Sequence, residues 1–256
     1  MRFAKYHVCR HDIIVAKERE ADLDCKLLCH RRLGIGADSL AFITASEHAD
    51  AGLVVYKADG RANVFCGDAL LCAAKHIYDN QWVRRRSMTI ETAGRTVELL
   101  WTLSNGEADR VTADLGEASQ SGKPIYNPYV PLRLVTLGQP YLIVETERLD
   151  GAPVNTLGKK LAHSPNYQQG IDVVFAMVPE QKKISLRIWA HGIGEVPCDG
   201  TAACSAAVAA MAQYKCDQSV TVQMPGGDLS VVWDEDSNHI FLTGTAERIF
   251  EGEYIP

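Results

Sequence analysis

The chain has 256 residues, 46% of them apolar and 23% charged, which is the composition of an ordinary globular protein. A chain of this length forms one large domain or two smaller ones, and its core needs no metal or disulfide for stability. The net charge of −6 argues against general nucleic-acid binding, which requires a concentrated basic face. The longest apolar run, Ala206–Ala212, is far shorter than the roughly 18 residues of a membrane span. Met1–His7 has no apolar stretch of the signal-peptide kind, so we expect a cytoplasmic protein without a membrane partner.

The predicted elements of the first half are mostly short strands. Alternating apolar and polar residues indicate strands, and apolar residues at helical spacing indicate helices. In chain order we predict a helix over Asp22–Arg32, a strand at Leu53–Lys57, a helix over Asp68–Tyr78, and strands at Met88–Thr92, Thr96–Trp101 and Arg110–Leu115. Pro124–Pro131 holds three prolines and no helical period, which predicts the link between two halves.

The second half has the same mixture of many strands and few helices. In chain order we predict strands at Leu132–Leu137 and Tyr141–Glu145, a helix over Asn155–His163, strands at Asp172–Met177 and Ile184–Trp189, a helix over Gly200–Tyr214, and strands at Val220–Gln223, Leu229–Trp233 and Ile240–Thr243.

A weak internal repeat relates the two halves. Val64–Ala74 and Val196–Ala207 both run from an extended segment through Cys and Gly into a helix rich in alanine and cysteine. The start of a helix binds a carboxylate and favours a thiolate, because its first N–H groups lack helical partners. Two thiols on opposite faces of the carbon beside a bound carboxylate can remove and return its proton and so invert that carbon.

The chain contains eight cysteines: Cys9, Cys25, Cys29, Cys66, Cys72, Cys198, Cys204 and Cys216. In a cytoplasmic chain of this size we expect reduced thiols and no disulfide framework. Cys25, Cys29 and His30 could suggest zinc, but no second Cys/His pair follows at finger spacing, so core packing at helical spacing explains them better. Cys72 and Cys204 are likewise expected inside helices as packing residues, and we expect no metal site.

Several spaced motifs resemble the diaminopimelate epimerase family, which contains cofactor-independent amino-acid racemases. They occur in the family's order along nearly the whole chain: Met1–His7, Arg32–Asp38 (R-L-G-I-G-A-D), Ala58–Gly60 followed by Cys66–Asp68, Gly138–Tyr141 (G-Q-P-Y), Gly192–Glu195 (G-I-G-E) and Phe250–Glu253 (F-E-G-E). The resemblance implies an α+β fold of two pseudo-symmetric halves, each a mostly antiparallel sheet around a central helix. The halves would be residues 1–118, with a returning strand at 246–256, and residues 119–245, with the active site in the cleft between them. It also implies a homodimer that uses no cofactor.

The resemblance assigns the first catalytic cysteine to Cys66 but leaves the second acid/base group open. Gapless alignment from Glu195 puts Asp199 where the family has its second cysteine, and Cys198 lies one residue earlier. Three interpretations follow: Cys198 reaches the substrate through a shifted turn, Asp199 transfers the proton, or Asp199 only caps the helix.

The resemblance also implies a set of substrate-binding residues: His11, Ser39, Lys57, Gly67, Asp68, Gln139, Asp172, His191, Glu195, Gly200 and Thr201. Several of them depart from the family pattern. His11, Lys57, Asp68 and Asp172 stand where the family motifs have asparagines, and His191 replaces the arginine that holds the distal carboxylate of diaminopimelate. Asp172 would repel a distal carboxylate, although Lys57 and His191 could offset this. We therefore expect a free amino acid with a basic or neutral polar side chain, such as histidine. Diaminopimelate itself, a one-base isomerase or lyase, and a non-catalytic carboxylate binder are the alternatives.

Overall fold

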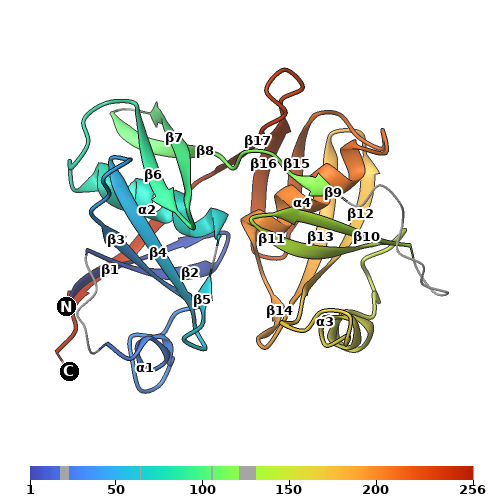
Figure 1. Ribbon diagram of the computed structural model, residues 1–256, viewed down its shortest axis with the longest axis horizontal. Helices are drawn as coiled ribbons and strands as arrows, with labels where there is room; N and C mark the ends of the chain where they lie inside the picture. The colour runs from blue at the N-terminus through green and yellow to red at the C-terminus, as the bar shows by residue number, and fades with distance from the viewer. Residues whose placement is uncertain (18–22, 64, 105, 121–130, 256) are drawn as a thin grey trace. The chain divides into compact units, whose positions relative to one another are not determined.

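The computed structural model describes residues 1–17, 23–63, 65–104, 106–120 and 131–255 (Figure 1). The chain forms two compact units: unit 1 comprises Met1–Asp114 and Thr243–Pro256, and unit 2 comprises Leu115–Leu242. The predicted link at 124–131 lies, apart from Pro131, outside the described residues. Each unit is a set of strands packed around one buried helix, so the expected α+β class is confirmed.

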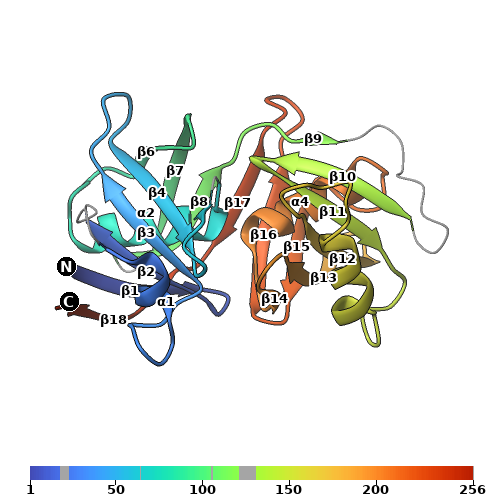
Figure 2. The same cartoon turned by 60° about the horizontal axis from the view of Figure 1, so that its bottom comes forward.

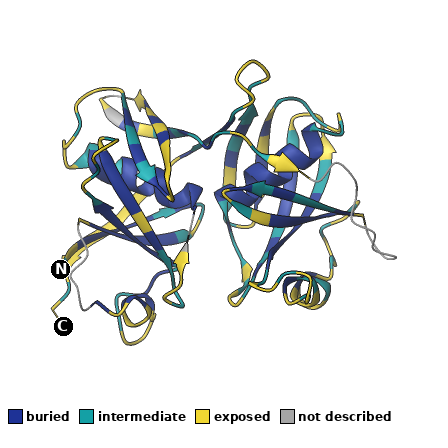
Figure 3. Ribbon diagram, viewed as in Figure 1, coloured by how far each residue is buried: buried dark blue, intermediate teal, exposed yellow. Residues whose placement is uncertain are grey.

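Unit 1 packs its strands around helix α2 (Gly67–Asp79), whose residues from Gly67 to Ala74 are all buried (Figure 3). The helix contacts strands on several sides, which include β1, β2, β3, β4 and β8. The strands of this unit are β1 (Arg2–Val8), β2 (His11–Lys17), β3 (Ser39–Thr44), β4 (Ala51–Lys57), β5 (Ala62–Asn63), β6 (Ser87–Thr92), β7 (Arg95–Ser104), β8 (Glu107–Asp114) and β18 (Glu247–Glu253).

Unit 2 has the same plan around helix α4 (Gly200–Met211), all twelve residues of which are buried. Because strands surround this helix, it is apolar on every side. Its small alanine side chains let those strands approach closely. The strands of this unit are β9 (Ser119–Gln120), β10 (Leu132–Leu137), β11 (Gln139–Glu145), β12 (Asp172–Glu180), β13 (Lys183–Ala190), β14 (Gly194–Val196), β15 (Ser219–Met224) and β16 (Gly227–Trp233). Strand β17 (Ile240–Gly244) carries the chain from unit 2 back into unit 1.

The two units share one order of strand pairing. In unit 1, β1–β2, β3–β4 and β6–β7 are antiparallel, whereas β2–β3 and β4–β6 are parallel. Unit 2 repeats this order with β10–β11, β12–β13 and β15–β16 antiparallel and β11–β12 and β13–β15 parallel. A short strand also pairs antiparallel with β4 in unit 1 (β5) and with β13 in unit 2 (β14). The internal repeat predicted from the sequence is therefore a true structural repeat.

The predicted helix over Asp22–Arg32 is wrong in length, because helix α1 spans only Cys25–Cys29. Its N-cap residue is Asp24, whose side chain accepts the N–H groups of Lys26 and Leu27 at 2.9 and 3.1 Å. Cys25 and Cys29 are both buried in an apolar cluster, so their packing role is confirmed. Burial raises the pKa of the Cys29 thiol to about 12, which keeps it protonated at neutral pH.

The predicted helix over Asn155–His163 is a π-helical turn at Val154–Gly158 followed by the short helix α3 (Lys159–Ala162). Gly158 lets this segment pack closely against β12 and β13, because a Cβ there would lie 3.1 Å from Phe175 and 3.2 Å from Trp189. The predicted helix over Gly200–Tyr214 is also too long. It ends at Met211, and Tyr214 has a φ of 56°, which an α-helix does not accommodate.

Candidate functional site

The first cluster of candidate residues lies at the start of α2 in unit 1. Cys66 is the N-cap residue, with extended dihedrals of φ −138° and ψ 106°, and its exposed fraction is 7%. Gly67 opens the helix and Asp68 lies in its first turn. The field at a helix start favours negative charge, so this position suits both a thiolate and a bound carboxylate.

His11 contacts two other predicted substrate-binding residues of unit 1. His11 Nδ1 lies 2.6 Å from Asp68 Oδ2, and His11 Nε2 lies 3.3 Å from Ser39 Oγ. Asp68 and Ser39 are almost fully buried, and the imidazole thus links the ends of β2 and β3 to the first turn of α2. Lys57 is the last residue of β4 and is partly exposed; its backbone N–H donates to the Arg61 carbonyl.

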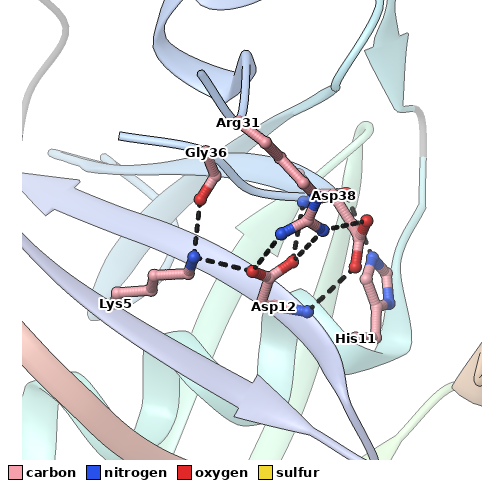
Figure 4. A network of polar contacts seen from close by, with 7 residues as sticks. Lys5, His11, Asp12, Arg31, Gly36 and Asp38 are labelled. Atoms are coloured by element: carbon pink, nitrogen blue, oxygen red, sulfur yellow. Dashed lines mark hydrogen bonds and ion pairs between the residues drawn. The ribbon is translucent and has the colours of Figure 1, made fainter. Parts of the chain in front are cut away.

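A network of charged side chains fixes the turn beside His11 (Figure 4). Arg31 donates to both oxygens of Asp12, at 2.9 and 2.8 Å, and to Asp38 at 2.6 Å. Lys5 Nζ lies 2.7 Å from Asp12 and donates to the Gly36 carbonyl. Burial opposes ionisation of Asp12, but the hydrogen bonds from Arg31 and Lys5 outweigh it and hold the Asp12 pKa well below its usual range. The network ties β1 and β2 to the Arg32–Asp38 motif through Gly36 and Asp38.

The second cluster lies at the start of α4 in unit 2, where Asp199 is the N-cap residue with φ −156° and ψ 111°. Asp199 Oδ1 accepts the backbone N–H of Ala202 at 2.9 Å. The Tyr141 hydroxyl lies 3.5 and 3.4 Å from the two carboxylate oxygens of Asp199, and Gln139 Nε2 donates to that hydroxyl at 2.5 Å. Gly200 and Thr201 open the helix and are buried.

Asp172 and His191 form a separate contact in unit 2. Asp172 is buried, and its Oδ1 accepts the backbone N–H of His191 at 2.6 Å. The His191 ring occupies the space beside Gly170, where a Cβ would overlap it, and its centroid lies 4.7 Å from that of His163. Asp172 is thus a buried carboxylate at the first residue of β12.

Glu195 is engaged by an arginine that the sequence did not single out. Arg187 donates from Nε and Nη2 to the two Glu195 oxygens at 2.7 and 3.0 Å. Tyr141, the contact of Asp199, was also missed as a site residue although it lies in the G-Q-P-Y motif. Arg187 reaches Glu195 across the β13–β14 pair, and Tyr141 on β11 reaches the N-cap of α4. The motifs do not show which strands and helix starts lie together.

Cys198 and Cys72 are both buried but differ in position. Cys198 directly precedes the N-cap of α4 and is 2% exposed, whereas Cys72 lies inside α2 and is fully buried. Burial raises the pKa of the Cys72 thiol well above its usual value, so the predicted packing role of Cys72 is confirmed. Among the described residues, no helix combines the length and the apolar character that crossing a membrane requires.

Comparison with known proteins identifies the family. The family model described as "Diaminopimelate epimerase" matches residues 3–120 and 133–249. A diaminopimelate epimerase of Acetivibrio thermocellus is 30% identical over 99% of this chain and 98% of its own length. Another, from Geobacillus thermodenitrificans, is 33% identical over 86% of this chain and 82% of its own.

A solved structure shares the fold at lower sequence identity. The crystal structure of a probable proline racemase from Agrobacterium radiobacter K84 matches with a TM-score of 0.80 and 15% identity, over 99% of this chain and 92% of that chain. The fold, the spaced motifs and the match along almost the whole sequence agree. The chain therefore belongs to the diaminopimelate epimerase family and is an isomerase, an epimerase or racemase of amino acids.

Proposed function

We propose that this protein inverts the α-carbon of a free amino acid by two-base proton transfer, without a cofactor. The observation that carries the proposal is the position of Cys66 at the N-cap of α2 in a chain of this family. The amides at the start of a helix can hold the substrate carboxylate and stabilise the negative charge that develops on it when the α-proton leaves.

Inversion requires two groups that act on opposite faces of one carbon. In this proposal Cys66 is one of them, and the second is Cys198 or Asp199 at the start of α4. One group removes the proton as a base while the other, in its protonated form, donates a proton from the opposite side. For substrate of the opposite hand, the two groups exchange roles.

We further propose that the substrate has a basic or neutral polar side chain, with histidine as the leading candidate. The buried Asp172 carboxylate supports this, because it would repel a second carboxylate and attract a cationic or hydrogen-bonding group. His191, in the position of the arginine expected for diaminopimelate, supports the same conclusion. Diaminopimelate remains the alternative, since it is named in the curated relatives.

The test is α-proton exchange in heavy water, followed by NMR on a panel of single enantiomers. The panel contains histidine, arginine, lysine, glutamine, proline and diaminopimelate. We expect exchange together with loss of optical rotation for a basic or polar member. Exchange with diaminopimelate alone would overturn the substrate proposal. A new product in place of the opposite enantiomer would indicate a lyase or proton-shift isomerase, and binding without exchange would indicate a non-catalytic carboxylate binder.

We also propose a cytoplasmic location and a homodimer. An acid/base thiol must stay reduced to work, which fits the reducing cytoplasm. The homodimer is supported by strand β18, all seven residues of which are exposed, including Ile249 and Phe250. An exposed strand with apolar side chains is a surface that commonly pairs with another chain.

A further inference from the structure

We propose that Asp199, and not Cys198, is the second acid/base group, so that the enzyme works with one thiol and one carboxylate. This inference rests on the proposed function and assigns the residue that the proposal leaves open. It depends on the structural repeat between the units, on the burial of Cys198 and on the contacts of the Asp199 carboxylate.

The repeat places Cys66 and Asp199 at the same position. The short strands β5 and β14 pair with β4 and β13 in the same register: Asn63 lies opposite Val55, two residues before the end of β4, and Val196 lies opposite Ile188, two residues before the end of β13. From Asn63 and from Val196 the chain takes three further residues to reach the N-cap of the following helix. These N-caps are Cys66 and Asp199.

The local backbone supports the same equivalence. Both N-cap residues are extended, with φ and ψ of −138° and 106° at Cys66 and of −156° and 111° at Asp199. Each is followed by a glycine that opens a buried helix. The two side chains therefore leave the backbone in the same direction relative to their helices.

Cys198 is instead equivalent to Phe65, the residue before the first N-cap. Phe65 is 1% exposed and Cys198 is 2% exposed, and both belong to the buried apolar set of their own units. Neighbouring side chains of an extended segment point to opposite sides. If the Asp199 side chain points to the same side as that of Cys66 in unit 1, the Cys198 thiol points to the opposite side, into the core.

The Asp199 carboxylate is held in place by polar partners. Oδ1 accepts the Ala202 N–H at 2.9 Å, and the Tyr141 hydroxyl approaches both oxygens. Gln139 donates to the Tyr141 oxygen, so the hydroxyl hydrogen is directed toward Asp199. Gln139 and Tyr141 are positioning residues in this assignment.

The proton transfer balances in both directions. When Asp199 is the base, the Cα–H bond breaks, the proton goes to the Asp199 carboxylate, and the electron pair passes into the substrate carboxylate. The Cys66 S–H bond then breaks as a new Cα–H bond forms on the other face, which leaves a thiolate. Exchange with solvent returns Asp199 to its carboxylate form and Cys66 to its thiol form. With the opposite enantiomer, the Cys66 thiolate is the base and the Asp199 carboxylic acid is the donor.

A mixed pair has a pH profile that two thiols do not have. A free carboxyl ionises near pH 3.9 and a free thiol near pH 8.5, according to ordinary model values. A carboxylate beside a protonated thiol is therefore the main form between these limits. A pair of thiols carries only one proton, as the reaction requires, only when the pH approaches the higher pKa range of a thiol. Replacing the carboxylate by a thiol should move the acid limb of kcat/KM upward by several pH units.

The experiment compares Asp199→Asn, Asp199→Cys and Cys198→Ser in the full chain, with the best substrate of the exchange panel. Asparagine caps a helix as well as aspartate does, so a residue that only caps would tolerate Asp199→Asn. We expect Asp199→Asn to lose inversion by 10²-fold or more, in line with about 10²–10⁴-fold for acid–base groups. It should still exchange the α-proton of the enantiomer whose hydrogen faces Cys66. Asp199→Cys should invert with its acid limb raised, and Cys198→Ser should change inversion by no more than a few-fold.

Two results would overturn the assignment. One is full inversion by Asp199→Asn with loss of inversion in Cys198→Ser, when circular dichroism shows both variants folded. The other is an acid limb that does not move in Asp199→Cys. Failure of the proposed function looks different, because the wild-type chain would then exchange no α-proton in the panel and Cys66→Ser would behave as wild type.

Discussion

At the residue scale, His11 and Asp68 form a close side-chain contact at two positions where the family motifs have asparagines. The pair is close, at 2.6 Å, and the side chains are 14% and 1% exposed. Both residues differ from the family asparagine, and together they form one buried contact. We therefore expect their contributions to the free energy of unfolding to be coupled.

We predict that His11→Asn lowers the free energy of unfolding by about 3 kcal/mol, because it leaves the buried Asp68 carboxylate without its imidazole partner. Asp68→Asn should also destabilise, whereas the double variant, which has the family's asparagines, should recover most of the loss. Urea unfolding of the four proteins gives the coupling energy. Additive effects of the two single changes would show that the pair is not coupled.

The sequence predicted the members of the candidate clusters better than their contacts. Motif spacing identified His11, Ser39 and Asp68, and the structure brings these three together. It did not show that Tyr141 approaches Asp199 or that Arg187 holds Glu195. Such contacts depend on strand register and on rotamers, which residue identity alone does not determine.

At the element scale, some strands lack the alternation that identifies a strand in the sequence, either because both faces are buried or because both are exposed. β2 has five consecutive buried residues, as does β3, and the two strands pair in parallel. Because both faces of such strands are covered, the period-two alternation that identifies a half-exposed strand is absent. β18, expected at 246–256 from the resemblance alone, lacks the alternation for the opposite reason, since all of its residues are exposed. Alternating strands such as β6 and β15 were found correctly.

The turn after α1 depends on Gly34. Its backbone N–H donates to the His30 carbonyl at 2.9 Å, and a Cβ at this position would overlap the carbonyl oxygen of Leu27. The chain therefore folds back directly against the helix, which ends the predicted longer helix and directs the turn toward Asp38.

We predict that Gly34→Ala lowers the free energy of unfolding by about 2–3 kcal/mol, since backbone atoms of α1 must move. Gly94→Ala is the matched control: its φ is +73°, but a Cβ there has no neighbour within 4 Å. The control should lose only about 1 kcal/mol from the strained dihedral. Thermal and urea unfolding measure both, and equal losses would show that the contact with Leu27 is unimportant.

At the scale of the whole molecule, the strand order of each unit was beyond what the sequence could predict. The repeat was visible only as two short segments, yet it extends to five strand pairings in each unit. The repeated segments also suggested that Cys66 corresponds to Cys198. The strand register shows instead that Cys66 shares its position with Asp199, because a single residue of offset changes which side chain lies at the helix start.

We predict that the chain is a homodimer in solution and that Ile249→Lys converts it to a monomer. Ile249 is 50% exposed on β18, so the change should cost the folded chain little by itself. Sedimentation velocity over a range of concentrations gives the mass, and Leu33→Lys is the control, because Leu33 is 73% exposed and is not part of β18. A monomeric wild type would contradict the prediction.

The pairing of β1 with β18 affects how the molecule is made. Met1 and Tyr254 exchange two backbone hydrogen bonds at 2.8 Å although they lie 253 residues apart in the sequence, and the two ends of the chain lie side by side (Figures 1 and 2). Unit 2 is one uninterrupted segment, whereas unit 1 is completed by residues that follow it. During synthesis, unit 2 can therefore reach its native pairing while β1 still lacks its outer neighbour. Unit 1 is translated first but is completed last, because β18 follows unit 2 in the sequence. Until β18 has emerged from the ribosome, Cys66 therefore lies in an incomplete unit.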